Sequence, residues 1–333
     1  MNEPLPLAPW LQTQLSDLLQ RRGHAWLLQG PSGLGQYTLG LQLAQAWLCE
    51  QPTPQGACGS CKSCHAVAVR THPDLCVLMP ETLALELGWP LDEKTQKDLD
   101  DKKRKPSKEI RVDAAREMVS FTQYTRSGGA TKVVLVYPAE RMNHVTANTI
   151  LKTLEEPPGE TRFVLASEAA HLLLPTIRSR CQTHTLNWPS TSAAYAWLEA
   201  HQVPAAEAAV LLKAAGGRPE DALQLARQGM QAKQWSALPK AVGQGQVSAL
   251  ADATPAQAID VLQKLCHDLL ALRSGADTRF FAPQDLPAGG SVQSLTQWAK
   301  ELMQQARTAE HPFNAGLMLE ALVARAQTAL RAK

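Results

Sequence analysis

The chain has 333 residues and a formal net charge of +2 at pH 7, a near-neutral balance that excludes the strongly basic type of nucleic-acid-binding domain. Its content of 44% hydrophobic and 19% charged residues is typical of a folded globular protein and excludes overall disorder. No run reaches the roughly 18 apolar residues of a membrane-spanning helix, and Met1–Trp10 has no secretion-signal pattern, so we expect a cytoplasmic protein without a membrane partner.

The first two hundred residues alternate between helical and strand patterns. Leu11, Leu15 and Leu18 recur on one helical face, which predicts an opening helix. Short apolar runs of strand length follow at residues 25–29, 75–79, 132–137, 162–166 and 183–186. Each run is separated from the next by enough chain for a helix, as in a parallel sheet with crossover helices. The pattern therefore predicts an α/β domain over residues 1–189.

A charged segment interrupts this alternation. Residues 92–109 are almost wholly polar, with seven basic and six acidic side chains. Such a segment buries too little apolar surface to offset the entropy lost on ordering it. We expect a solvated charged loop within an insertion at about 81–109, with a phosphate-binding role as the alternative.

The composition changes to Ala, Leu and Gln after residue 189, and strand-like runs disappear. Three short helices are predicted at residues 193–201, 205–215 and 219–228, which together suggest a small helical lid domain over 190–232. Amphipathic helical faces continue in the last hundred residues, and they predict a C-terminal all-α domain over 233–333.

A glycine-rich turn connects the first strand to the next helix. Gly30, Gly33 and Gly35 match the glycine frame of the phosphate loop G-x-x-x-x-G-K-[ST], but Gln36 and Tyr37 occupy the positions of the Lys and the small hydroxyl residue. Gln carries no charge for a phosphate, and the phenol of Tyr stands too far from the backbone to hold Mg²⁺. We therefore expect a degenerate loop with no functional ATP site, with a simple packing turn as the alternative.

Four cysteines lie within sixteen residues, in an insertion at about 49–65. They are Cys49, Cys58, Cys61 and Cys64. In a chain without a secretion signal, such crowding favours metal ligation over disulfides, and four thiolates form a closed tetrahedral site for structural Zn²⁺. An iron–sulfur cluster is the rival interpretation, and His65 is an alternative ligand for one of the thiolates.

Three further segments carry a resemblance to a known family. Residues 148–158 (NTILKTLEEPP), 163–167 (FVLAS) and 176–181 (TIRSRC) resemble the AAA+ subunits of bacterial DNA polymerase III clamp loaders. The resemblance is strongest to the delta prime branch, because the ATPase subunits carry Lys-Ser/Thr in the glycine loop and Asp-Glu at the end of a later strand. Here that strand runs into Tyr137, and the nearest carboxylate is Glu140.

The resemblance implies a three-domain AAA+ subunit with a C-terminal collar, which takes no part in hydrolysis itself. Its partners would be gamma/tau-type ATPase subunits and a delta subunit in a heteropentamer that loads the sliding clamp onto primer-template DNA. In the family, the Arg of a Ser-Arg-Cys motif projects towards ATP on a neighbouring subunit. The matching residue here is Arg180, which lies between Ser179 and Cys181. Two alternatives remain open: an active P-loop ATPase of the same assembly, and a zinc-dependent nucleic-acid-binding module.

Overall fold

The structure, a computed structural model, describes residues 7–126, 131–309, 311 and 314–332. The first six residues, which belong to the stretch considered above for a secretion signal, lie outside these ranges. The chain divides into two compact units, residues 1–189 and 190–333.

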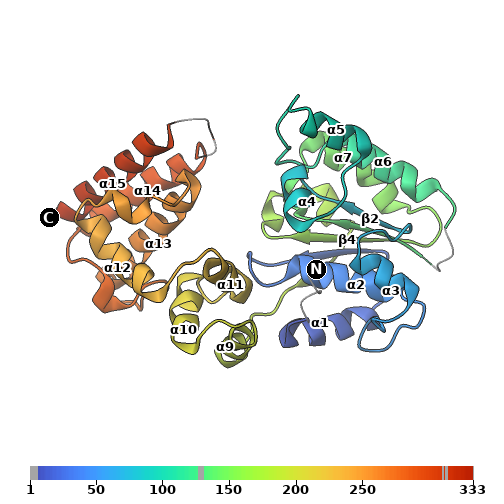
Figure 1. Ribbon diagram of the computed structural model, residues 1–333, viewed down its shortest axis with the longest axis horizontal. Helices are drawn as coiled ribbons and strands as arrows, with labels where there is room; N and C mark the ends of the chain where they lie inside the picture. The colour runs from blue at the N-terminus through green and yellow to red at the C-terminus, as the bar shows by residue number, and fades with distance from the viewer. Residues whose placement is uncertain (1–6, 127–130, 310, 312–313, 333) are drawn as a thin grey trace. The chain divides into compact units, whose positions relative to one another are not determined.

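The first unit is built around a five-stranded parallel sheet with the strand order β2-β3-β4-β1-β5 (Figure 1). The strands are β1 (Ala25–Gln29), β2 (Leu75–Leu78), β3 (Lys132–Val136), β4 (Thr161–Ser167) and β5 (Gln182–Thr185). All five predicted strands are confirmed, each within one residue of its expected bounds. Because the strands are parallel, their carboxyl ends lie at the same edge of the sheet, and the segments that follow them converge there.

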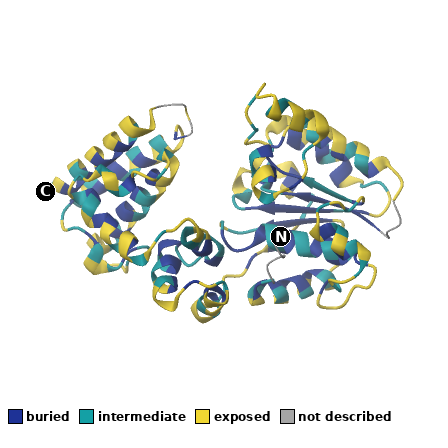
Figure 2. Cartoon of the chain, in the orientation of Figure 1, coloured by how far each residue is buried: buried dark blue, intermediate teal, exposed yellow. Residues whose placement is uncertain are grey.

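Helices cover both faces of this sheet (Figure 1). Helix α2 (Gln36–Leu48), with α1 (Pro9–Gln20) against it, packs on one face, and α6 (Val112–Gln123) and α7 (His144–Glu155) cover the other. The inner strand β3 is therefore buried along its whole length, and Figure 2 shows dark blue strands between the helices. The remaining helical elements are α3 (Lys62–Ala68), α4 (Glu81–Leu87), α5 (Glu93–Asp100), α8 (Pro175–Arg178) and the 3-10 turns Ala139–Arg141 and Ala170–Leu172.

The insertion at 81–109 differs from the expected loop, because α4 and α5 lie within it. Helix α5 begins after Asp92, whose carboxylate accepts a hydrogen bond from the backbone N–H of Thr95 at 2.8 Å. This N-cap and the helix-forming Glu, Lys and Gln residues that follow it explain the helix. No residue of α5 is buried, so the segment is solvated as predicted, but it is helical.

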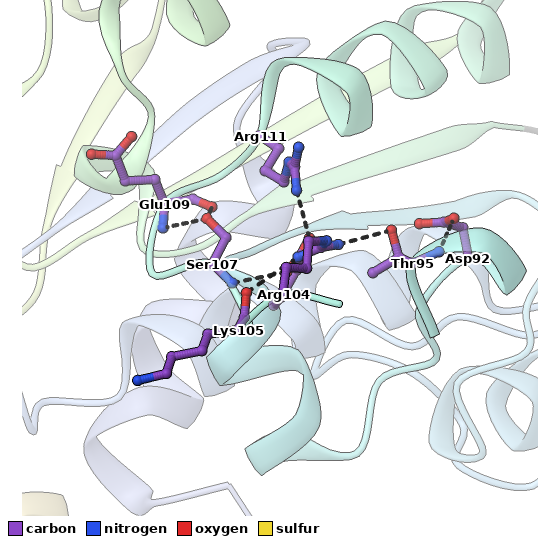
Figure 3. Close-up of polar contacts among 8 residues, drawn as sticks. Asp92, Thr95, Arg104, Lys105, Ser107, Glu109 and Arg111 are labelled. Atoms are coloured by element: carbon purple, nitrogen blue, oxygen red, sulfur yellow. Dashed lines mark hydrogen bonds and ion pairs between the residues drawn. The ribbon is translucent and has the colours of Figure 1, made fainter. Parts of the chain in front are cut away.

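The end of the insertion is fastened to the first turn of α4 through Glu81, whose exposed fraction is 7%. Nη2 of Arg104 donates to Oε1 of Glu81 at 2.8 Å, and the backbone N–H of Ser107 donates to Oε2 at 2.8 Å. Arg111 adds a cation 3.8 Å from Oε1 (Figure 3). Burial alone would raise the pKa of Glu81, but the hydrogen bonds from Arg104 and Ser107 and the two cations outweigh it and hold that pKa below its usual value. The insertion is thus an ordered part of the domain.

In the described residues of the second unit, all regular secondary structure is helical. Its helices are α9 (Thr191–Ala200), α10 (Ala205–Ala214), α11 (Pro219–Arg227), α12 (Ala232–Gly243), α13 (Pro255–Arg273), α14 (Val292–Ala306) and α15 (Ala315–Arg331), with 3-10 turns at Val247–Leu250 and Pro283–Asp285. The three short helices predicted after residue 189 are confirmed as α9, α10 and α11. The division into a lid over 190–232 and a collar over 233–333 stays a prediction, since both segments fall in one compact unit. Across the described ranges, none of the helices combines the length and the apolar composition that crossing a bilayer requires.

Candidate functional site

The glycine-rich turn lies at the carboxyl end of β1 and leads directly into α2. Gly33 and Gly35 have φ angles of 73° and 97°, a conformation that residues with a Cβ rarely adopt. Gly35 is the N-cap of α2, so the unsatisfied N–H groups of the first helical turn face the same loop. Gly30 continues the sheet by donating its N–H to the carbonyl of Ser167 at 3.3 Å. The backbone thus has the shape of a phosphate-binding loop.

The side chain of Gln36 is directed back into this loop. Its Nε2 donates to the carbonyl oxygens of Gly30 and Pro31, both at 2.7 Å, and only 2% of the residue is exposed. An amide NH₂ group has two donors, and both are used inside the loop. In a working phosphate loop a Lys at this position reaches the β- and γ-phosphates. Here the equivalent side chain crosslinks the loop to itself and brings no charge.

Tyr37 is held by the insertion. Nε1 of Trp89, one residue beyond the Gly that ends α4, donates to the phenol oxygen of Tyr37 at 2.6 Å. The ring of Tyr37 also lies 5.2 Å, centroid to centroid, from that of Tyr137 after β3. Burial raises the pKa of Tyr37, so its phenol stays neutral at physiological pH. The position that offers a metal-binding hydroxyl in an active loop is therefore occupied by a packed aromatic ring.

The carboxylate nearest in sequence after β3 is also engaged elsewhere. Oε2 of Glu140 accepts a hydrogen bond from Oγ of Ser167 at 2.7 Å, and Oε1 accepts one from the backbone N–H of Glu168 at 3.1 Å. These contacts join the segment after β3 to the end of β4. Glu140 thus stabilises the sheet edge through hydrogen bonds that already occupy both of its oxygens.

Arg180 follows the short helix α8 and makes three hydrogen bonds. Nε and Nη2 donate to the same oxygen of Glu155, Oε2, at 3.0 and 2.9 Å, and Nη1 donates to the carbonyl of Thr176 at 3.1 Å. Its side chain is 31% exposed. Ser179 beside it is exposed, whereas Cys181 is partly buried against the core, and burial raises the pKa of that thiol to about 12. Among the described residues, the partners of Arg180 come from α7 and α8, and the glycine loop contributes none.

The four predicted cysteines come together at the end of α2 and the start of α3. Their sulfur atoms all lie within 4.8 Å of one another, with Cys49–Cys61 and Cys58–Cys64 separations of 3.9 Å. A tetrahedral ion with metal–sulfur bonds of about 2.3 Å places its sulfur ligands about 3.8 Å apart, so the sulfur spacing fits such an ion closely. In the described part of the chain, the metal-binding group consists of these cysteines, and His65 is exposed and outside it.

Backbone N–H groups also point at the sulfur atoms of this cluster. The N–H of Cys58 donates to Sγ of Cys49 at 3.3 Å, and the N–H of Cys64 donates to Sγ of Cys61 at 3.4 Å. Hydrogen bonds from the backbone of Ser60 and Cys61 lower the pKa of Cys58 to about 6, whereas burial raises the pKa of Cys64. Metal ligation requires deprotonated thiolates, which such N–H donors stabilise. The cluster can therefore hold a metal ion.

Two contacts at these sites were not anticipated from the sequence. Trp89 is 52 positions from Tyr37, and Glu155 is 25 positions from Arg180. Neither separation corresponds to a local motif, so no pattern in the sequence pairs these residues.

Comparison with known proteins identifies the family. The family model described as DNA polymerase III, delta subunit, matches residues 9–190, more than half of the chain. The DNA polymerase III subunit delta' of Pseudomonas aeruginosa is 39% identical over 226 residues, which cover 67% of this chain and 62% of that protein. The subunit delta' of Escherichia coli is 36% identical over 225 residues, covering 65% of this chain and 60% of that protein. The match thus spans about three fifths of the length of these relatives.

A solved structure agrees in fold. The DNA polymerase III gamma subunit-related protein of Thermotoga maritima aligns with a TM-score of 0.51 at 19% identity, covering 97% of this chain and 100% of that one. This likeness shows the fold alone: a parallel α/β domain, here with a four-cysteine cluster, followed by helical structure. The resemblance noted in the sequence is confirmed, and the chain belongs to the DNA polymerase III delta' subunit family.

Proposed function

We propose that this chain is a non-hydrolysing delta' subunit of a DNA polymerase III clamp loader, which loads the sliding clamp onto primer-template DNA during ATP-dependent replication. In this role it joins gamma/tau-type ATPase subunits and a delta subunit in a cytoplasmic heteropentamer. It is then a non-catalytic member of an enzyme assembly, the DNA polymerase III holoenzyme.

One observation carries the non-hydrolysing role: both amide hydrogens of Gln36 are bonded to carbonyls of the glycine loop itself. A loop that binds triphosphate needs a cation at this position, and charge-assisted hydrogen bonds of that kind contribute roughly 1.5–3 kcal/mol each. Tyr37 and Glu140, the nearest substitutes for the Mg²⁺ ligands, are engaged with Trp89 and with the end of β4. These contacts argue against the alternative of an active ATPase.

Arg180 is our candidate for the contribution to catalysis in a neighbouring subunit. A guanidinium is permanently charged and can direct two donors at the oxygens of a γ-phosphate, where charge develops during phosphoryl transfer. The partial exposure of Arg180 after α8 is compatible with contact to a neighbouring chain. We infer that Arg180 acts as an arginine finger in trans.

We also propose that the bound ion is structural Zn²⁺. Four sulfur ligands close a tetrahedral site and leave no position for a reacting water. An iron–sulfur cluster is less suited, because in the bacterial ferredoxin pattern the fourth Cys follows the C-x₂-C-x₂-C run, whereas Cys49 precedes it. The near-neutral charge of the chain gives no support to a free-standing zinc module for nucleic acid.

The role of Arg180 can be tested in a clamp loader reconstituted from the full chain and its partner subunits. Arg180→Ala is expected to reduce DNA-stimulated ATP hydrolysis strongly, since arginine fingers contribute roughly 10³-fold or more at the site that they serve. Arg178→Ala is the matched control, because Arg178 is an exposed Arg two residues earlier and should leave turnover unchanged. Assembly of both variants is checked by gel filtration, and normal turnover by assembled Arg180→Ala loaders would contradict the proposal.

A further inference from the structure

The contact between Arg180 and Glu155 has a specific geometry. Glu155 is the last residue of α7, and one of its oxygens, Oε2, accepts from both Nε at 3.0 Å and Nη2 at 2.9 Å. Nε–H and one N–H of Nη2 lie along the same side of the guanidinium, so the carboxylate holds it by that side. The carbonyl of Thr176 fixes the other half through Nη1 at 3.1 Å. Three bonds to two partners therefore set the plane of the Arg180 head group.

These bonds leave part of the head group available. A guanidinium has five N–H donors, and the three bonds leave one on Nη1 and one on Nη2 without a partner among the residues that the structure describes. Two such donors suit two oxygens of one phosphate group. The exposure of 31% shows that the side chain is accessible at the surface. The contacts with Glu155 and Thr176 thus orient the charge without using all of its donors.

From this geometry we propose that Glu155 is a positioning residue for Arg180, which holds the guanidinium ready to meet the γ-phosphate of a neighbouring subunit's ATP. The proposal rests on the proposed function of Arg180 in trans. A free Arg side chain samples many rotamers. Fixing it in one rotamer on contact with the phosphate costs conformational entropy, which weakens that contact. Glu155 removes part of that loss in advance, and such preorganisation of a charge is a large factor in transition-state stabilisation.

Stability of the fold gives no competing reason for this pair. Glu155 is 56% exposed, and ion pairs at such positions contribute little to folding. The carboxylate also lowers the net charge beside the phosphate, which would oppose catalysis if charge alone mattered. The proposal therefore predicts that the hydrogen-bonding geometry of residue 155 matters more than its charge.

The test compares Glu155→Ala and Glu155→Gln in the reconstituted loader. Glu155→Ala is expected to lower the kcat for ATP about tenfold, as for a misplaced catalytic group, with little change in KM because the ATP pocket belongs to the neighbour. Glu155→Gln keeps an oxygen that accepts from Nε and Nη2, so it should retain most of the activity. Glu156→Ala is the matched control, since Glu156 is the adjacent exposed carboxylate and is not a partner of Arg180.

A double variant separates this inference from the proposed function. If Glu155 acts through Arg180, adding Glu155→Ala to Arg180→Ala should cause no further loss. Normal activity of Arg180→Ala would refute the trans role itself. Reduced activity of Arg180→Ala together with unchanged or increased activity of Glu155→Ala would refute only the positioning role, as would a further loss in the double variant. Thermal unfolding checks that each variant is folded. If Glu155→Ala misfolds, Glu155→Gln provides the test. An activity loss in folded Glu155→Gln as large as that of Arg180→Ala would then overturn the positioning role.

Discussion

Replacing Arg104 by Ala should loosen the insertion from the α/β domain. Arg104 donates to Glu81, whose side chain is 9% exposed, while its own side chain is 25% exposed. Removing one partner of a buried ion pair typically costs about 3–5 kcal/mol. Because Ser107 still donates to Glu81 and Arg104 is partly solvated, we expect about 2 kcal/mol here. For a unit of this size, that loss lowers Tm by about 4–8 °C.

Thermal and urea unfolding of the full chain measure this effect, with Lys103→Ala as the matched control. Lys103 is 59% exposed, and its ion pairs with Asp98 and Asp101 lie at the surface, so its removal should change stability by less than about 0.5 kcal/mol. Equal stability of the Arg104→Ala and Lys103→Ala variants at pH 7 would refute the reasoning.

The same pair predicts a pH dependence. The pKa of Glu81 lies below its ordinary value of 4.5, so the ionised carboxylate contributes stability that is fully present above that pH. This contribution is lost as the pH falls through the lowered pKa. The difference between the wild type and Arg104→Ala should therefore shrink when the pH is lowered below about 4, and a constant difference from pH 7 to pH 3 would contradict the assignment.

Two further predictions concern the metal and the nucleotide. Elemental analysis of the purified chain should find one zinc per chain, and removal of the metal by a chelator should lower the Tm; iron, or no metal in a sample purified without chelators, would contradict the Cys49, Cys58, Cys61 and Cys64 site. Isothermal titration and a hydrolysis assay should detect neither tight binding of Mg²⁺-ATP nor turnover by the isolated chain, because Gln36 and Glu140 are engaged internally; turnover would overturn the interpretation of the loop.

The sheet and the metal cluster could be predicted because their signals are local. Strands covered by helices on both faces need continuous apolar runs, and residues 133–136 provide one that is buried throughout. The cysteine spacing C-x₂-C-x₂-C places three ligands within seven residues, and Cys49 follows directly from the end of α2. The strand and the cysteine cluster are each encoded within a short segment, so they can be predicted without knowing which distant residues meet in the fold.

The remaining features depend on residues far apart in the chain. The contact of Trp89 with Tyr37 depends on how the insertion packs over β2, and the contact of Glu155 with Arg180 depends on the ends of α7 and α8. Helix α5 is a different case, because its signal was present. Asp92 is a good N-cap and the residues after it favour helix, whereas their polarity by itself predicts a loop.

From the internal bonding of Gln36 we expect the stability of this protein to be independent of the ATP concentration in a cell. A ligand stabilises a fold in proportion to the logarithm of its concentration relative to its dissociation constant. Gln36 brings no cation to the loop, and both of its amide hydrogens are bonded within it, so we expect the α/β unit to gain no such support from ATP. Its resistance to unfolding is therefore expected to remain the same in energy-rich and in starved cells, whereas a protein that binds ATP becomes more stable as the ATP concentration rises.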